Sequence, residues 1–241
     1  MSKTQKFLLT GLLMTAMGAA AVTPHSVNMG NLKVSEDFNS MWDAANSEAL
    51  LPLPEGWAMD RNLSAPRKIG KWIDASTEVM YTGGVSLASN AKNGTWNFGD
   101  SSNENDRALG GLTTTVDGGT RGVSILTAIT NDGEAPIDRF NISYSIEKYR
   151  KGDNAAGFAV QLYYSNDGEE WINAGTPFYT FFEPDDETLG TAVVPISTTP
   201  VGDKTLMADV APGATIYLAW NISVATGATA NKAPGLAIDD I

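Results

Sequence analysis

The sequence predicts an all-β fold, an antiparallel β-sandwich. Three observations support this: apolar and polar residues alternate in long runs, Asn-Asp-Gly and Asp-Gly-Gly turn signals separate the runs, and no 3.6-residue apolar period follows residue 21. Alternation sends one side-chain face to a core and the other to water, as in antiparallel sheets. With 241 residues, 42% of them hydrophobic, the chain is long enough to bury such a core without disulfides.

The N-terminus, residues 1–21, has the pattern of a signal peptide. Two lysines precede the apolar run 7–17, and Ala19 and Ala21 provide the small residues of a cleavage site. The run is shorter than the roughly 20 residues of a membrane span. The alternative is a buried N-terminal helix. We expect export to the periplasm, the cell surface or the medium, with no membrane insertion after cleavage.

After the signal peptide we expect a linker at residues 22–31 and one domain at 32–241. The only segment with helical spacing is Ser40 to Leu50, which can also be a loop. The last residues, Gly235 to Ile241, begin a strand and stop within it. Because domains usually end in polar coil, we expect either a fragment or further modules beyond this point.

Alternation predicts the individual strands of the domain in chain order. The four clearest lie at about 121–130, 140–147, 158–164 and 215–224. Their inward positions predict a core that contains Ile142, Tyr144, Phe158, Leu162, Leu218 and Trp220. Between the last two strands, the stretch 165–171 has the pattern of a hairpin, in which Asp and Gly suit the turn and Trp171 returns to the core.

Composition excludes several classes of function. The formal charge of −12 disfavours nucleic acid and anionic lipid as partners. The absence of Cys and the single histidine, His25, remove thiolate nucleophiles, Cys-based zinc sites and nearly all His-dependent catalysis. The acidic loop 185–187 fits solvated turn charges better than a pair of glycosidase carboxylates. We therefore expect no catalytic residues and no enzyme.

Several charged residues beside the strands have simpler interpretations. Glu147, Lys148 and Arg150 are expected to form ion pairs on the sheet surface, where each pair contributes little. Asp106 and Arg107 can form a buried ion pair near a glycine-rich turn, although the pattern does not decide this.

The two ends of the domain resemble a known family. The opening strand 35–39 is followed by Leu53-Pro54-Glu55-Gly56-Trp57, and the closing strand reads Leu236-Ala237-Ile238-Asp239-Asp240-Ile241. Together with the interior stretches 97–99 and 106–110, they resemble MAM and cleaved-adhesin (galactose-binding-like) modules, which occur in multidomain exported proteins of Bacteroidetes-type bacteria. The resemblance implies a jelly-roll sandwich whose first and last strands run side by side. It also implies a binding or adhesion role, with a glycan or a cell-surface protein as partner.

The same resemblance implies a structural calcium ion. In the relatives, carboxylates of the two terminal strands commonly hold calcium, and here these positions are Glu36, Asp37, Asp239 and Asp240. Asn39 stands where the relatives often have Glu, so the site carries less charge. The alternative is that Asp239 and Asp240 cap turns or pair with arginine at the sheet edge.

Polar strand faces also suggest a ligand site. Tyrosine rings beside amide side chains suit sugars, and we expect such a surface at Gln161, Tyr163, Tyr217 and Asn221. The alternatives are an ordinary wet sheet face or a face buried under a loop. Two function hypotheses follow: a non-catalytic binding or adhesion module, or the accessory N-terminal domain of a secreted hydrolase whose catalytic module lies beyond residue 241.

Overall fold

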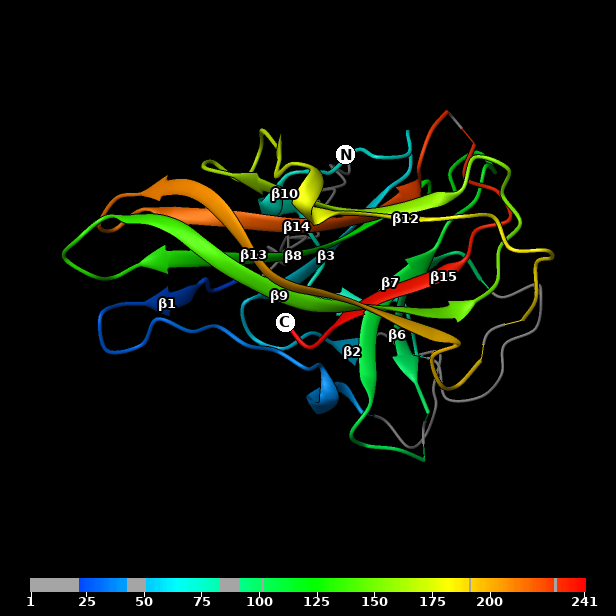
Figure 1. Ribbon diagram of the computed structural model, residues 1–241, viewed down its shortest axis with the longest axis horizontal. Helices are drawn as coiled ribbons and strands as arrows, with labels where there is room; N and C mark the ends of the chain where they lie inside the picture. The colour runs from blue at the N-terminus through cyan, green and yellow to red at the C-terminus, as the bar shows by residue number, and fades with distance from the viewer. Residues whose placement is uncertain (1–21, 43–50, 83–91, 101, 191, 228) are drawn as a thin grey trace, which may run out of the picture.

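Two β-sheets pack face to face around an apolar core (Figure 1). The computed structural model describes residues 22–42, 51–82, 92–100, 102–190, 192–227 and 229–241. The prediction of an all-β sandwich is confirmed. The expected signal peptide lies outside the described residues. Among the described residues, no helix is long and apolar enough to cross a membrane.

The first sheet has seven strands within the described residues and is mostly antiparallel. Its main order is β1-β8-β14-β10-β11, while β3 pairs with β8 and β12 pairs with β10. The strand bounds are β1 (His25–Val27), β3 (Trp57–Asn62), β8 (Gly122–Asn131), β10 (Phe158–Ser165), β11 (Ile172–Asn173), β12 (Tyr179–Phe182) and β14 (Thr215–Val224). The long central strands β8, β14 and β10 are those with the clearest alternation in the sequence.

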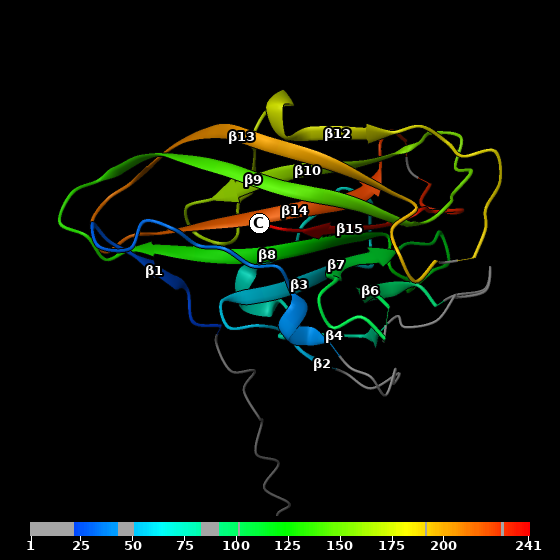
Figure 2. The same ribbon diagram turned by 60° about the horizontal axis from the view of Figure 1, so that its bottom comes forward.

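The second sheet has six strands within the described residues, in the order β13-β9-β15-β7-β6-β5 (Figure 2). The strand bounds are β5 (Tyr81–Thr82), β6 (Gly94–Gly99), β7 (Arg107–Leu112), β9 (Ile137–Arg150), β13 (Ser197–Val210) and β15 (Gly235–Asp239). The remaining elements are a small two-stranded sheet of β2 (Leu51–Pro52) and β4 (Glu78–Val79), and the 3-10 turns η1 (Asn39–Met41), η2 (Trp72–Asp74) and η3 (Thr176–Phe178).

The core lies between the two sheets and matches the sequence prediction. All six predicted core side chains are buried: Ile142, Tyr144, Phe158, Leu162, Leu218 and Trp220. Trp220 is fully buried, with the rings of Trp57 and Tyr144 at centroid distances of 6.0 Å and 5.8 Å.

The N-terminal part of the domain differs from the sequence prediction in two places. His25–Val27, within the expected linker, forms β1 and pairs in parallel with β8, because its backbone groups hydrogen-bond to the edge of that strand. Of the expected helical stretch Ser40 to Leu50, the described part contributes only to η1, and residues 43–50 lie outside the described residues.

The two ends of the domain are paired, as the resemblance implied. The backbone N–H of Glu36 donates to the carbonyl of Ile241 at 3.0 Å, and the N–H of Ile241 donates to the carbonyl of Glu36 at 2.9 Å. The segment around Glu36 is therefore held beside the end of β15, although it is not a regular strand.

A glycine allows β7 and β15 to approach closely. Gly110 of β7 pairs with Ala237 of β15. A Cβ added at Gly110 would overlap the carbonyl oxygen of Leu236 and lie 2.6 Å from the Cα of Ala237. Both obstacles are backbone atoms, so no side-chain rotation relieves the clash.

We expect Gly110→Ala to lower the free energy of unfolding by about 3 kcal/mol, because an overpacked sheet must shift its backbone. Urea denaturation measures the change. Gly202→Ala is the matched control, since its Cβ would meet no atom within 4 Å. A loss at Gly110 no larger than that of the control would contradict the close approach of the two strands.

Candidate metal site

Three carboxylates from distant parts of the sequence meet on the second sheet. Asp106, Glu147 and Asp239 each offer one oxygen, and these oxygens lie within 4.8 Å of one another. Glu147 and Asp239 are each only 6% exposed, while Asp106 is half-buried. We call these three residues the carboxylate cluster.

The strand order of the second sheet brings the cluster together. β15 lies between β9 and β7, so Asp239 at its end has Glu147 of β9 on one side and Asp106, just before β7, on the other. Ala237 is the register partner of Glu147, and Asp239 follows two residues later on the same face. The pairing therefore brings together at one point side chains that are 41 (106 to 147) and 92 (147 to 239) positions apart in sequence.

Hydrogen bonds satisfy part of the cluster and leave one buried oxygen without a donor. Tyr149 donates its hydroxyl to Oε2 of Glu147 at 2.6 Å, and Thr198 donates to Oε1 at 3.4 Å. Oδ1 of Asp239 is buried and has no hydrogen-bond partner among the described residues. A buried carboxylate oxygen without a partner is costly, and a cation beside it would remove that cost.

The electrostatics of the cluster favour protonation when no cation is present. Burial, together with the charges of the neighbouring acids, raises the pKa of Asp239 to about 8. Burial likewise raises the pKa of Glu147 and of Asp106, although Arg107 partly opposes the shift of Asp106. Because the three acids have raised pKa values at one point, a cation bound there would stabilise their ionised forms.

The chemistry of the donors fits calcium. All three are carboxylates, and calcium takes oxygen ligands in flexible arrangements of six to eight, which adjacent strands can complete with backbone oxygens. Magnesium requires a near-ideal octahedron at shorter distances, and the softer transition metals prefer nitrogen or sulfur ligands.

The structure distributes the four metal residues expected from the sequence over two places. Asp239 belongs to the carboxylate cluster. Glu36, Asp37 and Asp240 instead line a shallow concavity of about 300 Å³ beside Ile241. There, Oε1 of Glu36 accepts a hydrogen bond from the N–H of Phe38 at 2.8 Å, and Oδ1 of Asp37 accepts one from the N–H of Asn39 at 3.1 Å.

Asn39, which departs from the family pattern, has another role. Its Oδ1 accepts the backbone N–H of Arg107 at 3.0 Å, so it joins the N-terminal segment to β7. The buried Arg107 side chain donates to the side-chain and backbone oxygens of Asn97, at 3.0 Å and 2.9 Å.

The expected surface pairs around Glu147 are corrected by the structure. Glu147 is buried and belongs to the carboxylate cluster, since the outer face of β9 is covered at Glu147 and Tyr149, although it is exposed nearer the start of the strand. Arg150 is also buried and donates to the carbonyl of Ala233 at 2.9 Å. Lys148 forms an ion pair with Asp185 at 3.0 Å, which also gives part of the acidic loop 185–187 a structural role.

The residues expected to bind sugars lie on one sheet face, but two of them are inaccessible. Gln161 and Asn221 are register partners on β10 and β14, and both are buried. The Gln161 amide donates to the carbonyls of Leu162 and Gly175, and the Asn221 amide donates to Ser124. Tyr163 and Tyr217 keep partial exposure.

A connecting segment covers this face, which was the alternative interpretation. Arg67 donates its backbone N–H to the hydroxyl of Ser223 at 3.1 Å, and Trp72 packs against Tyr217 at a ring distance of 5.5 Å. Trp171, the last residue of the hairpin pattern, is half-buried under the same segment and donates to the carbonyl of Gly70 at 2.8 Å. The face is therefore not a wet surface with all four side chains free.

Fold and site together define an all-β sandwich with a buried carboxylate cluster at the junction of three strands. The structure is similar to the K3 cleaved adhesin domain of Lys-gingipain from Porphyromonas gingivalis, a domain of the type that the two ends of the sequence resemble. The sequence identity is 12%, the match covers 86% of this chain and 95% of that chain, and the TM-score is 0.41.

A second similar structure is the enzymatically active domain of tailspike protein 4 from bacteriophage CBA120. Its identity is also 12%, the match covers 77% of this chain and 19% of the tailspike chain, and the TM-score is 0.26. Neither a family model nor a curated protein matches the sequence. At these identities and TM-scores, the likenesses assign no function.

Proposed function

We propose that this chain is an exported, non-catalytic binding module of adhesion type that calcium stabilises. The carboxylate cluster carries the proposal: three acids in or next to three neighbouring strands converge, and one buried oxygen of Asp239 lacks a donor among the described residues. Calcium bound to Asp106, Glu147 and Asp239 would join β7, β9 and β15, and so fix the middle of the second sheet.

The proposed role is structural, because the cluster is unsuited to catalysis. Glu147 and Asp239 are buried beneath the sheet surface, and Tyr149 and Thr198 already hold Glu147 in place. Carbohydrate binding through the outer face of the first sheet is not part of the proposal, since Gln161 and Asn221 are buried. The partner of an adhesion module would then contact another surface.

We expect EDTA to lower the melting temperature and calcium, but not magnesium, to restore it. An ion that binds only the folded state stabilises it by about 2.7 kcal/mol when its concentration is a hundredfold above Kd. Differential scanning calorimetry in EDTA, calcium and magnesium measures this response.

Two variants make the experiment specific. Asp239→Asn should abolish the calcium response while leaving the metal-free protein at least as stable as the wild type, because a neutral amide replaces a buried acid. Asp186→Asn, at an exposed position, should keep the full response. A wild-type melt that is indifferent to EDTA, with no calcium found by metal analysis, would reject the proposal.

A further inference from the structure

A β-bulge at the end of β13 alters which residues stand opposite the start of β9. The register of the two strands shifts between Met207 and Val210. As a result, Ala208 and Asp209 both stand opposite Asp138. Bulges re-aim side chains and occur often beside active sites. Here the bulge leaves two acidic residues at one point, where both line the same pocket.

This pocket lies where β10 and β13 end and β9 begins, so it joins the two sheets at one end of the sandwich. Its volume is about 360 Å³, within the range of about 300–1,000 Å³ that is typical of small-molecule sites. It is lined by Asp138, Tyr164, Asn166, Met207, Ala208 and Asp209. The pocket is on the β13 side of β9, away from the edge where β15 pairs. We call it the end pocket.

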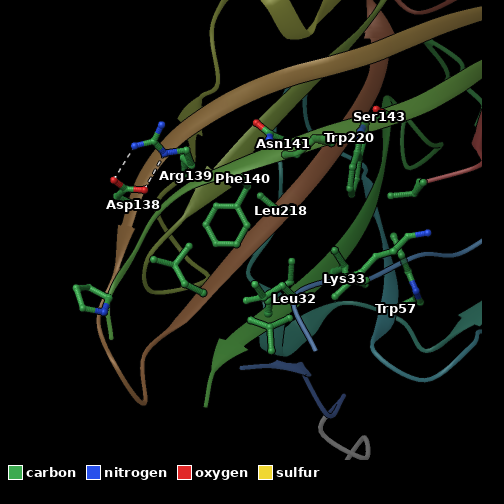
Figure 3. A pocket seen from close by; sticks show the side chains of 18 residues that line it. Leu32, Lys33, Trp57, Asp138, Arg139, Phe140, Asn141, Ser143, Leu218 and Trp220 are labelled. Atoms are coloured by element: carbon green, nitrogen blue, oxygen red, sulfur yellow. Dashed lines mark hydrogen bonds and ion pairs between the residues drawn. The ribbon is translucent and has the colours of Figure 1, made fainter. Parts of the chain in front are cut away.

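Most polar groups of the end pocket have no partner in the described part of the chain. The Tyr164 hydroxyl, the Asn166 amide and the Asp209 carboxylate form no hydrogen bond or ion pair with a described residue. Asp138 differs, since its two oxygens accept hydrogen bonds from Arg139 at 2.9 Å and 3.0 Å (Figure 3). Because Arg139 compensates the charge of Asp138, the pocket offers one further carboxylate and several neutral hydrogen-bonding groups to a ligand.

The turn that carries Asn166 is held in place by its own hydrogen bonds. The Ser165 hydroxyl accepts the backbone N–H of Gly168 at 2.9 Å, and Oδ1 of Asp167 accepts that of Glu169 at 2.8 Å. Asn166 therefore projects from a fixed backbone. A ligand that bonds to its amide would not have to order the turn, which lowers the entropic cost of binding.

We propose that the end pocket binds a neutral sugar, one pyranose unit of a glycan. A pyranose has apolar C–H faces and a rim of hydroxyl groups. The Tyr164 ring and the Met207 side chain, which is 61% exposed, provide apolar surface for such a face. The Asn166 amide both donates to and accepts from hydroxyls, and the Asp209 carboxylate accepts from them in charge-assisted hydrogen bonds.

Other classes of ligand fit these residues less well. Phosphate and other anions would be repelled by two carboxylates in a chain whose formal charge is −12. A metal ion would meet the guanidinium of Arg139 at one of its two carboxylate ligands, and two carboxylates supply few of the six to eight oxygens that calcium takes. An apolar ligand would bury the amide and the carboxylate without partners.

The end pocket shares no residue with the carboxylate cluster. Its test is run in saturating calcium, with sugar binding as the readout, whereas the proposed function is tested by the response of the melting temperature to metal. Each can therefore fail while the other succeeds.

The test follows the backbone amide signals of the isotope-labelled chain by NMR while glucose, galactose, mannose or N-acetylglucosamine is added. We expect at least one of these sugars to bind with a Kd in the millimolar range. The shifts should concentrate at residues 138–139, 164–167 and 206–209. Glycerol at the same concentration of hydroxyl groups is the control for a general solvent effect and should leave these signals unchanged.

Two variants make the test specific. Asn166→Ala and Asp209→Ala should each weaken binding at least about tenfold, because each removes hydrogen bonds to hydroxyls. Both positions are exposed, so the fold should persist, which circular dichroism checks. Asp186→Ala, at an exposed position of the acidic loop 185–187, is the matched control and should bind like the wild type. Binding of none of the sugars, equal shifts with glycerol, shifts confined to other residues, or variants that bind as well as the control would each overturn the inference.

Discussion

Trp220→Ala is expected to lower the free energy of unfolding by about 3–5 kcal/mol, the range of large-to-small substitutions at well-packed aromatic core positions. Trp220 is fully buried on β14, the central strand of the first sheet, where its register partners are Leu162 and Ile125. The loss of the indole leaves a void beside Trp57 and Tyr144. The two sheets could fill this void only if their strands shifted from their present positions.

Guanidinium denaturation in saturating calcium measures this effect, with the slope of the transition as a check on two-state behaviour. Met207→Ala is the control, because truncation to alanine at this exposed position of β13 removes little packing and should lower the free energy of unfolding by less than about 0.5 kcal/mol. A loss of less than about 1 kcal/mol at Trp220 would mean that its side chain is not in the core.

The second large effect concerns pH. Without metal, the folded protein keeps a proton on Asp239 up to a pKa of about 8, whereas the unfolded chain loses it near the ordinary value of 3.8. Between these values the folded state binds more protons at Asp239, so the contribution of this residue to stability is greatest below about pH 4 and falls as the pH rises towards 8, by about 1.4 kcal/mol per unit at most. Glu147 and Asp106 act in the same direction, since their pKa values are also raised.

The proposed calcium ion should reverse this dependence, because it would bind the ionised carboxylate. From about pH 5 to 8 each proton must leave before the ion binds, so the affinity should rise by up to about tenfold per pH unit and level off above the pKa. Isothermal titration calorimetry at a series of pH values measures the affinity and the protons released. Asp239→Asn removes the main titrating group, and the metal-free variant should show a flatter melting profile. An affinity that is constant from pH 6 to 9 would contradict the raised pKa of Asp239.

Period-2 alternation was sufficient to predict the long strands and their buried face. It works for β8, β10 and β14 because each has one face against the core, and the inward positions are therefore apolar with few exceptions, such as Thr127 of β8. β13 was missed, since the stretch 197–210 alternates weakly and has several exposed positions on an edge strand. β1 was missed because three residues are too few for any period to be visible.

The site was only partly predictable from the sequence, for a reason that concerns the outer faces of the sheets. Glu147 sits on the outward face of β9, which the pattern describes as wet, yet Tyr149 two residues later packs on Phe98 at a ring distance of 4.9 Å. An aromatic residue at that spacing was the available signal that this face is covered. Asn221 gave no such signal, because Arg67, which donates to the neighbouring Ser223, lies 156 residues away in sequence. Gln161 is held from the other direction, by the carbonyl of Gly175.

The position of β15 has a consequence for how the chain acquires its fold. It is the last of the described strands in sequence, yet it occupies the middle of the second sheet, between β9 and β7. In a nascent chain that lacks β15, the pair β13–β9 is not joined to the pair β7–β6. The edges of β9 and β7 that β15 would occupy are then both unpaired. The domain should therefore fold only after synthesis of β15, and slowly, because its central pairings join distant segments. Proteolytic removal of β15 would likewise open the centre of a sheet instead of fraying its border.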